Sequence, residues 1–128
     1  MPAVFWNEVQ NWNGCMRKRK EVIGMKKAYI CSPFRATTNS EQERNINYAK
    51  RLTLKALRDG FAPITPHLYL TQCLNEKDLY ERQMGLNAGL ALLEDCDVMY
   101  IGLAYGMSEG MCSEVKKAQM LGIDIVKF

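Results

Sequence analysis

The sequence has little of several things, and each shortage excludes a class of protein. Its 128 residues include one histidine and five scattered cysteines with no C-x-x-C pair, so a structural zinc site cannot be assembled from the usual ligand spacings. The most apolar run, residues 86–93, is too short to cross a membrane. The formal net charge is only +3. We therefore expect no metal, no cofactor and no membrane contact.

The cysteines also bear on the compartment. Their number is odd, and the chain lacks a positively charged start followed by an apolar signal region. These features predict a cytoplasmic protein with reduced thiols. Cys31 and Cys96 occupy strand-like positions, where cysteine usually serves as a small buried apolar residue.

What is present suits one soluble domain, since 48% of the residues are apolar and 24% are charged. Residues 1–24 lack a clear period and end before Met25, which opens a lysine-rich start to a strand. We expect residues 1–24 to be an appendage, either a disordered tail or a start codon assigned too early, and residues 25–128 to be the domain. Phe5, Trp6 and Trp12 argue against disorder.

A basic cluster, Arg17–Lys20, could contact nucleic acid or acidic lipid. A solvated tail is the simpler interpretation, so a nucleic-acid partner is not expected.

From residue 27 onward, apolar strand patterns alternate with helical patterns. Strands are expected at residues 28–32, 61–65, 98–103 and 123–128. Helices are expected at residues 40–57, 79–93 and 108–121, with residues 66–78 as a long connection. Ser40 and Glu43 have capping-box spacing, Ser108 is a candidate cap, and Gly60 and Gly122 are suited to left-handed helix ends.

This order predicts an α/β fold, a flavodoxin-like or Rossmann-like three-layer sandwich with a parallel sheet of four to five strands. Such sheets bind ligands beyond the carboxyl ends of their strands, where the strand order reverses. If the first strand lies beside the third, the loops after Ser32 and Leu103 border that point.

These two loops hold the candidate binding residues. The first is Ser32-Pro33-Phe34-Arg35, in which the Arg35 guanidinium could hold a phosphate or only pair with a neighbour. The second leads into a helix whose start could bind an anion through backbone N–H groups and the Ser108 hydroxyl, beside Met111. Gly110 and Glu114 share a helix face, so a ligand above the glycine could reach the carboxylate. Taken alone, a glutamate such as Glu114 is more often a solvated surface residue.

Three segments together resemble the nucleoside 2-deoxyribosyltransferase superfamily, which includes deoxynucleoside monophosphate N-glycosidases and many small phage and bacterial proteins. They are AYICSPFR, EDCDVMYIG and SEGMCSEVKKAQMLGI, and the resemblance runs from about Lys27 to Phe128. The S-x-G-x-x-x-E pattern in the third is the most specific. The resemblance implies a nucleotide or nucleoside ligand and a homodimer or larger homo-oligomer, in which a neighbouring subunit often completes the pocket.

By position, the resemblance gives Glu114 the role of nucleophile at the anomeric carbon and Tyr29 the role of orienting its carboxylate. It places Arg35, Ser108 and Gly110 at a 5′-phosphate or 5′-hydroxyl.

One position departs from the family pattern. Active members carry an aspartate about eight residues before Asp97, where this chain has Gly89. Cleavage of an N-glycosidic bond usually needs a proton for the leaving base. The candidates to serve the base are Asn87, which can only hydrogen-bond, Asp95, and His67, for which a structural role is the alternative. Asp97 itself is expected to cap the strand.

Two main functions therefore stay open, together with an interaction protein that uses the basic amino terminus. One is an enzyme that cleaves or transfers the N-glycosidic bond of a (deoxy)nucleotide through Glu114. The other is an inactive binding module, a sensor or sponge for a signalling nucleotide. The base, the need for a phosphate and the oligomeric state are not determined by the sequence.

Overall fold

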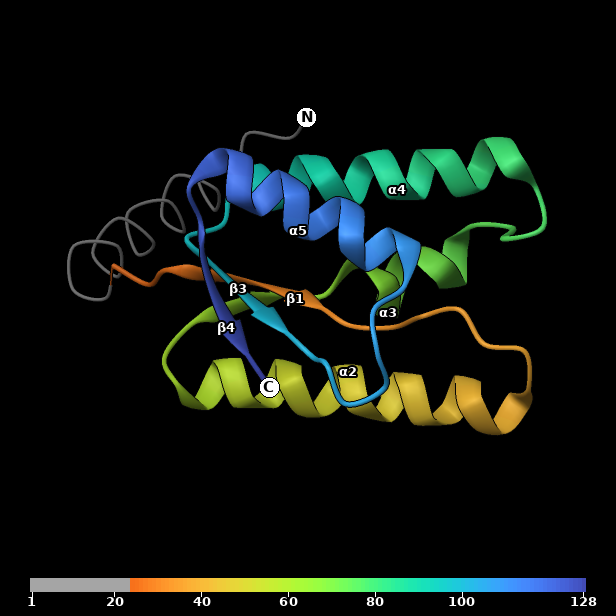
Figure 1. Ribbon diagram of the computed structural model, residues 1–128, viewed down its shortest axis with the longest axis horizontal. Helices are drawn as coiled ribbons and strands as arrows, with labels where there is room; N and C mark the ends of the chain where they lie inside the picture. Colours follow the sequence, from red (N-terminus) through yellow and green to blue (C-terminus); the bar gives the residue numbers. More distant parts are fainter. Residues whose placement is uncertain (1–23) are drawn as a thin grey trace, which may run out of the picture.

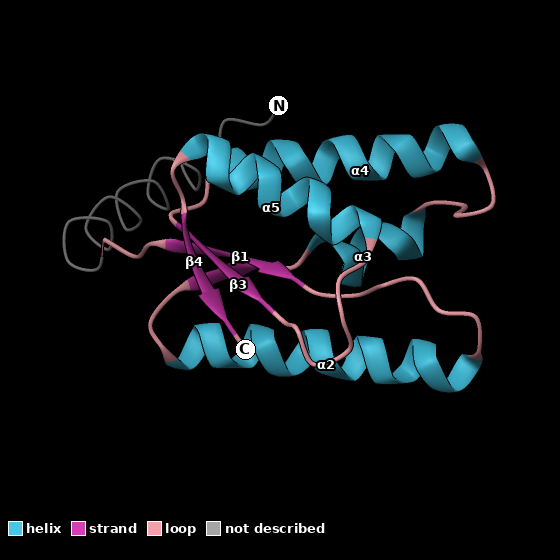
Figure 2. Cartoon of the chain, viewed as in Figure 1, coloured by secondary structure: helices cyan, strands magenta, loops and turns pink. Residues whose placement is uncertain are grey.

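The computed structural model describes residues 24–128, and the expected appendage at residues 1–24 lies almost wholly outside this range. The described chain is an α/β sandwich of three layers (Figures 1 and 2). The strands are β1 (Lys27–Cys31), β2 (Ala62–Ile64), β3 (Val98–Ile101) and β4 (Asp124–Lys127). The helices are α2 (Asn39–Arg58), α3 (Pro66–Cys73), α4 (Leu79–Glu94) and α5 (Glu109–Leu121).

The four strands form one parallel sheet in the order β2-β1-β3-β4. In this register Tyr29 at the centre of β1 pairs with Ile64 of β2 and Met99 of β3. The predicted fold class is therefore confirmed, with four strands. Because β1 lies beside β3, the strand order reverses between them, and their carboxyl ends form the expected ligand-binding edge.

The core has two halves, since successive residues of a strand face opposite sides of the sheet. Ala28 and Ile30 face α2, where they pack with Tyr48 and Leu52. Tyr29, Cys31 and Met99 belong to the other half, together with buried residues of α4 and α5. In Figure 1, α2 covers one face of the sheet, and α4 and α5 cover the other.

Two predicted helix signals need correction. The cap of α2 is Thr38, whose Oγ1 accepts from the N–H of Glu41 at 3.1 Å, so the capping box begins two residues before Ser40. Thr38 and Glu41 have the same S/T-x-x-E spacing, and Glu41 also accepts from the N–H of Thr37. Residues 66–73, expected as connection, form α3, because Pro66 occupies its first turn, where proline needs no N–H partner.

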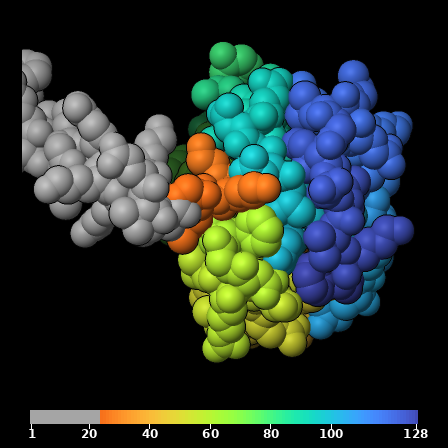
Figure 3. Space-filling view, turned by 90° about the vertical axis from the view of Figure 1, so that its left-hand side faces the viewer, coloured from red at the N-terminus to blue at the C-terminus, as the bar shows by residue number. Residues whose placement is uncertain are grey.

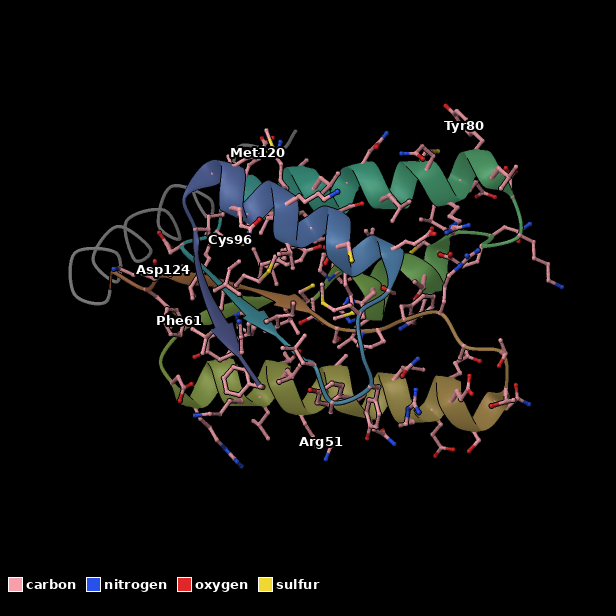
Figure 4. All side chains as sticks on the ribbon, in the orientation of Figure 1. Arg51, Phe61, Tyr80, Cys96, Met120 and Asp124 are labelled. Carbon is pink, nitrogen blue, oxygen red and sulfur yellow. The ribbon has the colours of Figure 1, made fainter. Side chains whose placement is uncertain are left out.

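The other end of the sheet, where the strands begin, is closed by backbone and side-chain contacts. There the N–H of Lys27 donates to Oδ2 of Asp97 at 2.8 Å, so Asp97 caps the strand as expected. Figure 3 shows the molecule from this side. The start of β1 (orange) lies at the surface, and the C-terminal strand β4 (dark blue) lies to its right. Cys96 lies toward the same side in Figure 4, and both Cys96 and Cys31 are buried.

Candidate active site

A cavity of about 360 Å³ opens beyond the carboxyl ends of β1 and β3, within the size range of small-molecule sites. β1 and the loop after it line one side, and the first turns of α5 line another. The remaining walls come from α3, the α3–α4 connection and α4. Both predicted loops therefore meet at one cavity.

Tyr29 and Glu114 lie together in the wall of this cavity. The Tyr29 hydroxyl donates a hydrogen bond to Oε1 of Glu114 at 3.1 Å. Tyr29 is only 1% exposed and packs in the core with buried residues of α4 and α5, which holds the hydroxyl in place. The two residues that the sequence proposed as a catalytic pair are thus in direct contact.

The surroundings of Glu114 disfavour its charge. Burial raises the pKa of Glu114, and hydrogen bonds from the Cys31 thiol and the Tyr29 hydroxyl oppose this rise in part. Burial, together with the nearby Glu114 carboxylate, raises the pKa of both Tyr29 and Cys31, so these two groups stay protonated donors. A partly buried carboxylate with two donors has the chemistry of a nucleophile or of a clamp on sugar hydroxyls.

His67 and Ser32 form a second polar pair in the cavity wall. Ser32 Oγ and His67 Nε2 are 2.8 Å apart, and the Phe34 ring and the imidazole are arranged edge to face with their centroids 6.5 Å apart. Burial lowers the pKa of His67 to about 4, so the ring is neutral at physiological pH. The pair can exchange hydrogen bonds with a ligand, with the donor set by the tautomer of the ring.

Arg35 also lines the cavity, and it is exposed at the mouth. The loop that carries it is held by Asn45 of α2, whose Nδ2 donates to the carbonyl oxygens of Phe34 and Arg35 at 3.4 and 3.3 Å. Asn45 is only 2% exposed, so this clamp is built into the core. No sequence pattern identified Asn45 as a residue that supports the site.

At the start of α5, Ser108 caps the helix as predicted, and its Oγ accepts from the N–H of Met111 at 3.2 Å. Ser108, Gly110 and Met111 all line the cavity. A side chain at Gly110 would come no closer than 4.0 Å to another atom, so its absence leaves open space beside Glu114. Met111 is 2% exposed and also packs in the core.

Two predicted binding residues do not line the cavity. Asn87 is exposed on α4 and accepts a hydrogen bond from Gln83, because the cavity face of α4 is set by Gly85 and Gly89. A residue two positions from either glycine points to the opposite side of the helix. Pro33 is buried in the turn beneath its neighbours. Asp95 also lies away from the cavity, at the exposed end of α4.

Gly89 lies close to the Tyr29 hydroxyl. It is buried, and a Cβ atom placed on it would lie 3.1 Å from the Tyr29 hydroxyl. That distance is shorter than an ordinary contact, so a side chain here would require Tyr29 to move by a few tenths of an ångström.

The sequence interpretation missed several lining residues on α3 and beside it, because it treated this segment as connection. They include Leu70, Thr71, Leu74, Glu76 and Arg82. Pro66, which suits the first turn of a helix, is the signal that could have indicated α3. Within residues 24–128 no group of three or more His, Cys, Asp or Glu side chains could hold a metal ion. The described helices also include none that is long and apolar enough to span a membrane.

Residues 26–128 match the family model described as "Domain of unknown function (DUF7768)". The chain belongs to this family. No curated protein sequence matches it significantly.

Among solved structures, this DUF7768 domain is similar to a 2-deoxyribosyltransferase from the psychrotolerant bacterium Bacillus psychrosaccharolyticus. The TM-score is 0.59 at 18% sequence identity, and the match covers 80% of this chain and 71% of that one. At this identity the match shows a shared fold, which agrees with the family resemblance read from the sequence.

Proposed function

We propose that the DUF7768 domain cleaves or transfers the N-glycosidic bond of a nucleotide or nucleoside, with Glu114 as the nucleophile. The observation that carries this proposal is the hydrogen bond from Tyr29 to Glu114 inside a cavity of ligand size. The shared fold with a 2-deoxyribosyltransferase supports it.

In this mechanism Tyr29 holds the carboxylate of Glu114 toward the anomeric carbon of the sugar. The carboxylate attacks that carbon as the base departs, and a glycosyl ester forms on Glu114. Water or a second base then displaces the glutamate and restores the carboxylate. Arg35 and the start of α5, with Ser108 and Gly110, hold the 5′ end of the ligand.

The proposal is tested by incubating the protein with a panel of nucleosides and nucleoside monophosphates and following free base by chromatography. Release that is lost in Glu114→Gln and kept in Glu43→Gln supports the proposal, because Glu43 is exposed on α2 away from the cavity. No release from any substrate would contradict it.

A second candidate is an inactive nucleotide-binding module, a sensor or sponge, and Gly89 favours it because no acid stands at that position to protonate a base. This candidate predicts thermal stabilisation by a nucleotide without base release. In that case Glu114→Ala would leave binding largely intact.

We also propose that the domain forms a homo-oligomer. Leu79 and Tyr80 at the start of α4 are 78% and 74% exposed, and Met120 of α5 is 84% exposed. Tyr80 and Met120 point away from the sheet in Figure 4. A subunit contact would remove these apolar side chains from water. Light scattering after gel filtration would give the number of subunits, and a monomer at all concentrations would contradict the proposal.

A further inference from the structure

We propose that the substrate is an N-glycoside whose leaving heterocycle carries a positive charge while attached to the sugar, as in an N7-alkylated purine nucleotide or an N-ribosylated pyridinium. This inference rests on the proposed function and names the substrate class of the same cavity. Such heterocycles leave as neutral molecules, so they need no proton from the protein.

The part of the cavity wall that α4 forms supplies no carboxylic acid. Gly85 and Gly89 form that part of the wall, and the backbone at Gly89 approaches the Tyr29 hydroxyl too closely for a side chain to enter freely. The Tyr29 hydroxyl itself donates to Glu114. A Cβ atom at Gly85 would meet Leu74 and one at Gly89 would meet Tyr29, so close packing explains both glycines, and neither position supplies a proton donor to the cavity.

His67 does not replace the missing acid. Its Nε2 is paired with Ser32 Oγ at 2.8 Å, and its ring is packed against Phe34. Burial of the imidazole keeps it neutral near pH 7. A neutral base such as guanine would receive no proton from α4 or from His67, and its departure as an anion is slow.

The charges that line the cavity suit a cation. Among the described residues, three carboxylates, Glu76, Glu109 and Glu114, line it with two guanidinium groups, Arg35 and Arg82. A positive heterocycle beside Glu114 would stabilise the ionised carboxylate, which is the nucleophilic form and which burial otherwise disfavours.

The bonds and charges balance without any further reactant in the first step. An oxygen of the Glu114 carboxylate bonds to the anomeric carbon, and the electron pair of the broken C–N bond stays on the heterocycle and cancels its positive charge. Water then attacks the glycosyl ester, the carboxylate leaves, and the proton of the water passes to the solvent.

The test uses a matched pair of probes, N7-methyl-2′-deoxyguanosine 5′-monophosphate and 2′-deoxyguanosine 5′-monophosphate, which differ by one methyl group and one charge. Base release is measured with the wild-type protein and corrected for the spontaneous rate in buffer. We expect kcat/KM for the methylated probe to exceed that for the other by at least about 100-fold, the lower end of what general acid catalysis contributes.

The methylated probe could react faster either because the cavity lacks an acid or because its base is intrinsically the better leaving group. Gly89→Asp distinguishes these two explanations, with Gly89→Asn as the matched control. The aspartate should raise release from the unmethylated probe and shrink the ratio at least about 10-fold, whereas asparagine should not. Release from the unmethylated probe within about 10-fold of the methylated one by wild type would overturn this inference and leave the proposed function standing. Release from neither probe would overturn both.

Discussion

The Tyr29 hydroxyl donates a hydrogen bond to Oε1 of Glu114 across 3.1 Å, which joins the centre of β1 to α5, 85 residues further along the chain. This bond favours the ionised carboxylate and opposes the effect of burial. It therefore links the geometry of the cavity to the ionisation state that a nucleophile needs.

Tyr29→Phe removes the hydroxyl and keeps the ring in the core. We expect the pKa of Glu114 to rise further, because one of its two donors is lost. The acidic limb of the pH profile of kcat/KM should then move to higher pH, with a loss of roughly 10-fold or more at neutral pH. An unchanged acidic limb would show that the hydrogen bond does not control the ionisation of Glu114.

Glu114→Gln should stabilise the fold at neutral pH. The folded-state pKa of Glu114 lies above its ordinary value, so the wild-type protein loses stability as pH rises through that folded pKa. Glutamine stays neutral and escapes this loss, with an expected gain of about 1 kcal/mol in the free energy of unfolding. Thermal unfolding should show the variant to be more stable than the wild-type protein at pH 8. This difference should vanish below pH 4, where Glu114 is protonated in both the folded and the unfolded protein. A difference in stability that does not depend on pH would contradict this account.

Arg35→Ala should weaken ligands that carry a phosphate. The loss of one charge-assisted contact predicts roughly 10- to 100-fold weaker binding of a nucleoside monophosphate and little change for the free nucleoside. Arg51→Ala is the matched control, because Arg51 points away from the sheet in Figure 4 and lies outside the cavity. Calorimetric titration of both variants checks the prediction, and equal losses for phosphate and nucleoside would count against it.

The parallel sheet and the edge that carries the site could be predicted because β1 and β3 are short apolar runs that alternate with helical patterns, as central strands of a parallel sheet do. The eight-residue α3 could not, since a short segment starting with proline has little helical periodicity and is stabilised by packing on α4. Asn87 was misplaced for a related reason. The side of α4 that faces the sheet is the one that carries the two glycines. This could not be predicted, because α4 is apolar on several sides.

His67 makes the stability of the fold depend on pH in the direction opposite to that of Glu114. Its folded-state pKa of about 4 lies below the ordinary value of 6.5, so stability present above pH 6.5 is lost as pH falls toward 4, up to about 3 kcal/mol. His67→Gln should lessen this acid sensitivity. Because the chain has one histidine, its imidazole NMR signals are assigned without ambiguity, and a titration midpoint near 6.5 in the folded protein would show that the ring is not buried as described.

The central claim, that Glu114 forms a bond to the sugar, is tested most directly by mass spectrometry of the protein after reaction with a 2′-fluoro-substituted nucleotide, which slows release of the sugar from the enzyme. The account predicts that the peptide containing Glu114 gains the mass of the glycosyl group, and that Glu114→Gln gains none. Base release without this mass gain, or the same gain in Glu114→Gln, would contradict it.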